Sequence, residues 1–109
     1  PIAGRTFGVF GALADKDVGG IVAPLSLRID RWYLAGLDAM TSRGLAVAEL
    51  RERVAATASR LAPIVSHADP REALAAAQRQ AAAGDRIVAF GSFYVAAVAL
   101  DALDPGKRV

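Results

Sequence analysis

The 109-residue sequence contains no cysteine, which excludes disulfide bonds and thiolate metal sites and fits a cytoplasmic enzyme. No apolar stretch reaches the ~18 residues that a membrane-spanning helix needs, and no signal-peptide pattern is visible. The net charge is only +2, with cations and acidic residues interspersed, so no basic stripe indicates a nucleic-acid partner. A hydrophobic fraction of 54% instead indicates one folded domain.

Apolar periodicity predicts strands that alternate with helices along the whole chain. The expected strands are 5–12, 31–35, 64–68 and 85–91. The expected helices are 15–29, 45–62, 69–84 and 92–103. Pro24 lies inside the first helical pattern, so we expect that helix to kink or end there. Such alternation is typical of an α/β fold with a mostly parallel sheet flanked by helices.

The last predicted strand leads directly into the last predicted helix. Its run "IVAF" (87–90) does not alternate apolar and polar residues, which favours a strand buried on both faces. Gly91 then permits a tight turn, and Ser92 is a candidate N-cap of the helix. Free amides at that helix start favour an anion, so Ser92 is also a candidate ligand-binding residue. A cap with no further role is the alternative.

The motif "ADKD" (14–17) occupies the equivalent position after the first strand. Lys16, between Asp15 and Asp17, is a candidate partner for a carboxylate or phosphate, with a solvated surface lysine as the alternative. Carboxyl ends of parallel strands share one edge, so this motif and Ser92 are expected to line one anion pocket. Arg43, in the loop 36–44, is a further candidate for its rim, or else an exposed loop arginine.

The remaining motifs argue against other chemistries. His67, the single histidine, has no ligand at metal-binding spacing and indicates a surface residue at a strand end. "GSF" is not the Gly-x-Ser-x-Gly elbow of serine hydrolases, and no general base is in sight. The phosphate-binding glycine fingerprints are absent as well. The sequence therefore predicts no metal site and no catalytic residue of its own.

Four segments nevertheless resemble a known family. "FGALADKDVGGIVAPL", "DRWYLAGLD", "SRGL" and "GDRIVAFGSFYVAAVAL", in this order and spacing, are similar to the C-terminal domain of bacterial dihydrofolate synthase/folylpolyglutamate synthases, which are Mur-ligase-type ATP-dependent amide ligases. The likeness runs from about residue 5 to 103. It implies a three-layer Rossmann-like domain over residues 1–109, cut from a longer enzyme and lacking its first β-α unit.

The resemblance also implies a reaction. ATP phosphorylates a pterin or folate carboxylate, and L-glutamate attacks the acyl phosphate to form an amide. ATP and Mg are then bound mainly by a missing central domain, so this chain alone is expected to be inactive. Lys16 is implied to hold a glutamate carboxylate, and Ser92 to donate a hydrogen bond to one. Ser42 stands where the family usually has proline, so the sequence departs from the family pattern directly beside Arg43.

A second hypothesis stays open from the residues alone. The complete run of β-α units, with two carboxylates in "DKD", also fits a stand-alone anion-binding or regulatory module of the receiver type. Within the ligase hypothesis, the sequence does not separate dihydrofolate synthase from folylpolyglutamate synthase activity, because the pterin pocket lies elsewhere.

Overall fold

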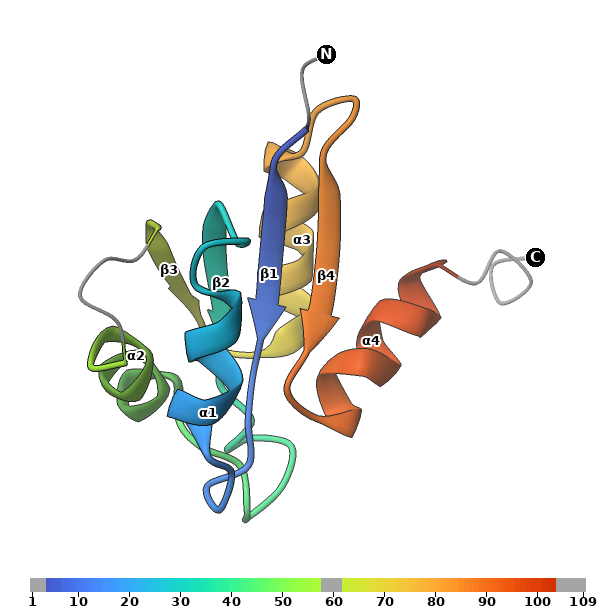
Figure 1. Cartoon of the computed structure of the whole chain (residues 1–109). Helices are drawn as coiled ribbons and strands as arrows, with labels where there is room; N and C mark the ends of the chain where they lie inside the picture. Colours follow the sequence, from blue (N-terminus) through green and yellow to red (C-terminus); the bar gives the residue numbers. More distant parts are fainter. Residues whose placement is uncertain (1–3, 58–61, 104–109) are drawn as a thin grey trace.

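A computed structural model describes residues 4–57 and 62–103 (Figure 1). Its strands are β1 (Thr6–Phe10), β2 (Arg31–Ala35), β3 (Ile64–His67) and β4 (Arg86–Phe90). Its helices are α1 (Val18–Val22), the short 3-10 helix η1 (Ala23–Leu25), α2 (Val47–Ala55), α3 (Pro70–Gln80) and α4 (Phe93–Leu103). The alternation of strands and helices expected from the sequence is confirmed.

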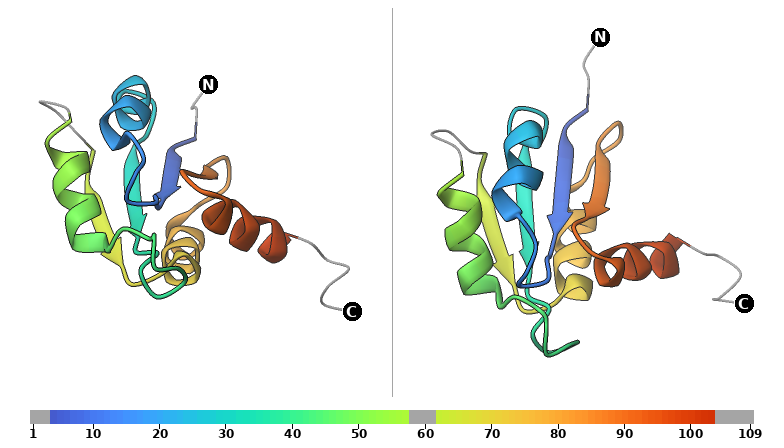
Figure 2. Two further views of the ribbon diagram at one scale, coloured as in Figure 1. Left: turned by 90° about the horizontal axis from the view of Figure 1, so that it is seen from below. Right: turned by 60° about the horizontal axis from the view of Figure 1, so that its bottom comes forward.

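The four strands form one sheet in the order β3-β2-β1-β4, and every pair is parallel. Helices α1 and α2 cover one face, while α3 covers the other (Figures 1 and 2). This arrangement is the α/β architecture with a parallel sheet between helices that the sequence predicts. Because all strands run the same way, their carboxyl ends meet at one edge.

Each face of the sheet carries its own apolar cluster. Phe7, Val9 and Tyr33 pack against α3 and α4, whereas Phe10 and Trp32 pack against α1 and α2. All five side chains are at most 1% exposed. Neighbouring residues of β1 and β2 thus face opposite layers, as strand geometry requires. The two central strands are the rigid support for the loops that follow them.

The prediction that "IVAF" forms a strand buried on both faces is wrong. The segment is β4, at the end of the sheet, and the side chain of Val88 is 41% exposed. The continuous apolar run indicated burial, but among the described strands only β1 pairs with β4. An apolar edge strand is unusual, because such edges invite pairing with other chains.

Helix boundaries follow local chemistry. Pro24 lies in the first turn of η1, directly after α1, so the expected break near this proline is confirmed. Asp69 caps α3 by accepting a hydrogen bond from the Glu72 amide, but α3 ends at Gln80 and not at Gly84. The helix expected over 45–62 is shorter in the structure, because α2 ends at Ala55 and residues 56–57 form a turn. Residues 58–61 of that expected helix and the tail 104–109 lie outside the described residues. Of the helices in the described ranges, none is long and apolar enough to cross a membrane.

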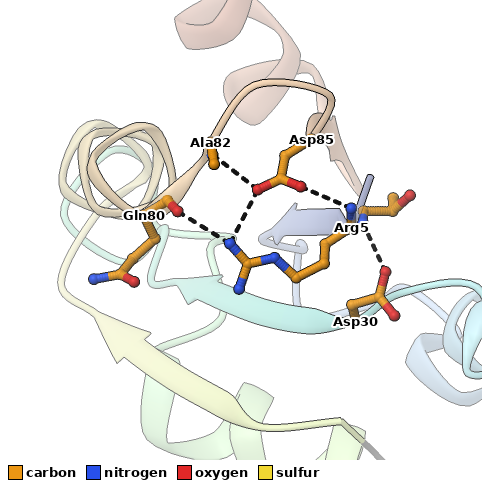
Figure 3. Close-up of polar contacts among 6 residues, drawn as sticks. Arg5, Asp30, Gln80, Ala82 and Asp85 are labelled. Atoms are coloured by element: carbon orange, nitrogen blue, oxygen red, sulfur yellow. Dashed lines mark hydrogen bonds and ion pairs between the residues drawn. The ribbon is translucent and has the colours of Figure 1, made fainter. Parts of the chain in front are cut away.

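A polar clasp fastens the amino ends of β1 and β4 (Figure 3). The Asp85 carboxylate accepts hydrogen bonds from the Arg5 amide at 2.8 Å, the Arg5 guanidinium at 3.0 Å and the Ala82 amide at 2.8 Å. The amides of Ala82 and Arg5 and the Arg5 side chain lower the pKa of Asp85 to about 2. The clasp lies at the edge opposite the candidate site and therefore serves stability.

Candidate functional site

Two loops leave the carboxyl edge of the sheet side by side, after β1 and after β4. Gly91 has φ +104°, and a Cβ atom there would lie 2.4 Å from the Gly11 carbonyl oxygen. The amide of Gly11 in turn lies 3.4 Å from the Phe90 carbonyl oxygen, to which it donates. Glycine is therefore required at this predicted tight turn, because the backbone conformation disfavours a side chain and the Gly11 carbonyl leaves no room for a Cβ atom.

Ser92 follows this turn and directly precedes α4. Its Oγ accepts a hydrogen bond from the Val95 amide at 3.2 Å, so the predicted N-cap is confirmed. The accepted bond leaves the hydroxyl proton of Ser92 available as a donor. The first amides of α4 have no partners within the helix, which gives this helix start a partial positive charge.

The loop after β1 is braced by the loop after β2. The Ala14 amide donates to the Arg43 carbonyl at 2.8 Å, and the Leu45 amide donates to the Ala12 carbonyl at 3.0 Å. Leu13 and Gly44 form an antiparallel bridge between the same segments. These backbone bonds bring the "ADKD" motif and Arg43 together, as the sequence predicts for the rim.

The charged residues of this cluster have different partners. Arg43 forms an ion pair with Asp15 at 3.2 Å, with both side chains about two-thirds exposed. Asp17 caps α1 by accepting a hydrogen bond from the Gly20 amide at 3.0 Å. The Lys16 side chain is exposed, and its ammonium group makes no hydrogen bond or ion pair with the described residues. Lys16 is therefore the cation of this loop that remains free to bind a ligand.

Lys16 lines an open hollow of about 630 Å³ between α1 and α2. The other lining residues are Asp17, Val18, Gly19, Gly20, Ala23, Arg53, Ala56 and Thr57. Ser92 does not line this hollow, so the expected pairing of Lys16 with Ser92 around one ligand stays a prediction. Sequence reasoning missed Arg53, whose guanidinium donates to the Ala14 carbonyl at 3.2 Å and pairs with Glu49. The spacing of four residues between Glu49 and Arg53 on a helix is a local signal that could have indicated this ion pair, but no local pattern indicates the contact with Ala14.

Other notable residues of the sequence contribute to packing. His67 is the last residue of β3, so its expected place at a strand end is confirmed, but its side chain is only 16% exposed and stacks on Tyr33. Trp32 and Tyr33 are buried packing residues. Within residues 4–57 and 62–103, no group of three or more His, Cys, Asp or Glu side chains is placed to hold a metal ion.

Comparison with known proteins gives a consistent result. The family model for the glutamate ligase domain of Mur ligases matches residues 1–93. Dihydrofolate synthase/folylpolyglutamate synthase of Escherichia coli is 33% identical over 104 residues, which are 95% of this chain and 22% of the relative. The enzyme of the same name from Buchnera aphidicola is 31% identical, over 84% of this chain and 20% of the relative. This chain thus spans about a fifth of the length of these relatives.

Solved structures agree with the sequence comparison. E. coli FolC in complex with DHPP and ADP superposes with a TM-score of 0.81 at 31% identity, covering 100% of this chain and 24% of that chain. A bifunctional folylpolyglutamate synthase/dihydrofolate synthase with Mn, AMPPNP and L-glutamate bound gives a TM-score of 0.74 at 33% identity, over 92% of this chain and 22% of its own. The likeness therefore extends over nearly all of the described sheet and helices.

Proposed function

The chain belongs to the Mur ligase family, as its glutamate ligase domain, and on this premise we propose that it is the glutamate-binding domain of an ATP-dependent folate ligase. The parent enzyme joins L-glutamate to dihydropteroate, to a folyl-(poly)glutamate or to both. Residues 1–109 are the C-terminal domain of that polypeptide, and the isolated domain is inactive. A relative with 33% identity that has L-glutamate bound supports the choice of ligand.

The observation that carries the proposal is the free ammonium of Lys16 on a loop that starts beside the Ser92 turn. Lys16 neutralises one carboxylate of L-glutamate. The Ser92 hydroxyl, which is already fixed as an acceptor from Val95, donates its proton to a carboxylate at the start of α4. A charge-assisted hydrogen bond of this kind is stronger than a neutral one.

Three further residues form the rim of the proposed site. Arg43 adds a second positive charge close to Lys16, while its ion pair with Asp15 holds its guanidinium at the loop. Asp17 acts through the backbone, because its cap on α1 fixes the end of the loop that carries Lys16. None of these residues transfers a proton or forms a bond, so this domain positions the amino acid and leaves the chemistry to the rest of the enzyme.

ATP and Mg supply the activation of the substrate carboxylate, and we assign neither to this chain. Relatives of this chain were solved with ADP, or with AMPPNP and Mn, and we propose that the corresponding metal and nucleotide sites lie mainly in the remainder of the polypeptide. The central domain of the same polypeptide is therefore the expected partner, together with a pterin or folate substrate. We place this ATP-dependent enzyme in the cytoplasm.

The proposal is tested by measuring phosphate release by the full-length enzyme with ATP, Mg, dihydropteroate or tetrahydrofolate, and L-glutamate. Phosphate release should require L-glutamate and should yield one amide per phosphate, and the isolated 109-residue chain should release none. Phosphate release that does not depend on L-glutamate, or that continues equally with another amino acid, would reject glutamate as the ligand of this domain.

A further inference from the structure

The turn that carries Lys16 has little apolar support. Residues 14–17 are all exposed, whereas Ala12 before them and Val18 after them are buried. The Lys16 amide donates to the Leu13 carbonyl at 3.1 Å, which closes the turn on itself. Because the side chains of residues 14–17 lie outside the core, the position of this turn relative to the sheet depends on polar contacts with other elements.

Arg53 of α2 supplies such a contact. One terminal nitrogen of its guanidinium donates to the Ala14 carbonyl at 3.2 Å, and the other donates to the Glu49 carboxylate at 2.7 Å. The guanidinium is planar, so one bond from each nitrogen fixes its orientation. The Arg53 side chain is 36% exposed, compared with 66% for Arg43, which pairs with Asp15 in the same turn. Arg53 is therefore the less solvated of the two contacts, and an exposed ion pair contributes little.

Helix α2 is a firm base for this contact. Leu50 and Val54 are fully buried in the core, on either side of Arg53 in the sequence. Helix α1, which follows the turn, lies beside α2 (Figures 1 and 2). Arg53 and Lys16 line the same hollow between these two helices. The Arg53 side chain thus connects a well-packed helix to the exposed turn.

We propose that Arg53 is a positioning residue for L-glutamate, because its bond to the Ala14 carbonyl holds the turn that presents the Lys16 ammonium. This inference rests on the proposed function, since it concerns the ligand of Lys16. Glu49 offsets the charge of Arg53, which leaves Lys16 as the unpaired cation among the described residues that line the hollow. A turn that is fixed before binding loses less freedom when the ligand arrives, so affinity rises without a further contact to the ligand.

The KM of the full-length enzyme for L-glutamate tests this role. Arg53→Met keeps an unbranched apolar stem and removes the donors, so it should raise this KM roughly 3- to 10-fold, with kcat and the KM for ATP unchanged. Arg51→Met is the matched control. Arg51 lies on the same helix but donates to the Ile64 carbonyl and the Ser66 hydroxyl, so its loss should leave the KM for L-glutamate at the wild-type value.

A double variant separates positioning from a direct charge effect. If Arg53 acts through Lys16, Arg53→Met should add little to the KM for L-glutamate once Lys16→Ala is present. An equal rise in both backgrounds would overturn the positioning role, because Arg53 would then attract L-glutamate directly. A wild-type KM in Arg53→Met, beside a raised KM in Lys16→Ala, would reject this inference alone. An unchanged KM in Lys16→Ala would reject the proposed function and this role of Arg53 with it.

Hydrogen exchange of the full-length enzyme without substrates reports on the turn itself. The amides of Lys16 and Val18 both donate within this segment. Arg53→Met should therefore speed exchange in a peptide spanning residues 11–18, whereas Arg51→Met should not. Arg53→Lys retains a donor for the Ala14 carbonyl and should cause a smaller increase. Exchange in this peptide that is the same in Arg53→Met and wild type would overturn the proposal, because the turn would then hold its position without Arg53.

Discussion

Gly91 and Gly11 approach so closely that a single added methyl group at Gly91 would overlap the Gly11 carbonyl oxygen. The contact joins the start of α4 to the loop after β1, which are separated by 80 residues in the sequence. Because Ser92 follows Gly91 and Lys16 lies farther along the loop of Gly11, this contact connects the two segments that carry the proposed glutamate ligands.

Replacing Gly91 by alanine should therefore be costly. The residue has φ +104°, and its Cβ would also lie 2.5 Å from the Phe10 ring, so strain and overlap should together lower the free energy of unfolding by about 2–3 kcal/mol. Gly84→Ala is the control. Gly84 has φ +90°, but a Cβ there would meet only the Gly4 Cα at 4.0 Å, so the loss should be smaller, about 1 kcal/mol. Equal losses in urea denaturation would show that the Gly91–Gly11 contact is unimportant.

Substitutions of Ser92 should separate its capping role from its proposed binding role. Ser92→Ala removes the acceptor for the Val95 amide and should lower stability by about 1 kcal/mol. Ser92→Asp keeps a good cap and should retain stability, but its negative charge should repel a carboxylate. In the full-length enzyme, Ser92→Asp should therefore raise the KM for glutamate more than Ser92→Ala does. A wild-type KM in Ser92→Asp would limit Ser92 to capping.

The clasp at Asp85 predicts a pH dependence of stability. Its pKa is lowered from 3.8 to about 2, mainly by the Ala82 amide, so the charged carboxylate stabilises the fold above about pH 4. This contribution should disappear as the pH falls towards 2. Asp85→Asn should therefore be less stable than wild type at pH 7, and the difference in thermal midpoint should narrow between pH 4 and pH 2.

Asp38→Asn, at an exposed loop position, provides the comparison for this titration. Its thermal midpoint should follow that of the wild type over the whole pH range. A difference between wild type and Asp85→Asn that stays constant from pH 7 to pH 2 would show that the clasp does not depend on the charge of Asp85.

Local sequence patterns predicted much of this fold. The helix caps Asp17, Asp69 and Ser92 are residue types that favour the N-cap position. Each of them accepts a hydrogen bond from the amide three residues later, which is a local interaction. Pro24 marked a helix break for an equally local reason. Parallel pairing followed from the alternation of strands and helices, without knowledge of which strands are neighbours.

The predictions from sequence failed where contacts with residues distant in the sequence determine burial or hydrogen bonding. An apolar composition indicated that "IVAF" is buried, but the order of the strands puts β4 at the edge. His67 is covered by Tyr33, from an adjacent strand, and Arg53 reaches Ala14 across 39 residues. The clasp between Arg5 and Asp85 spans 80 residues and gives no local signal at all.

The most direct test of the glutamate-binding role is the KM of the full-length enzyme for L-glutamate in the Lys16→Ala variant. Loss of a hydrogen bond to a charged group should weaken binding by about 1.5–3 kcal/mol, which raises this KM roughly 10- to 100-fold, with the KM for ATP unchanged. Arg79→Ala, an exposed cation in the last turn of α3, should behave as wild type. An unchanged KM for L-glutamate in Lys16→Ala would contradict the proposed role of this loop.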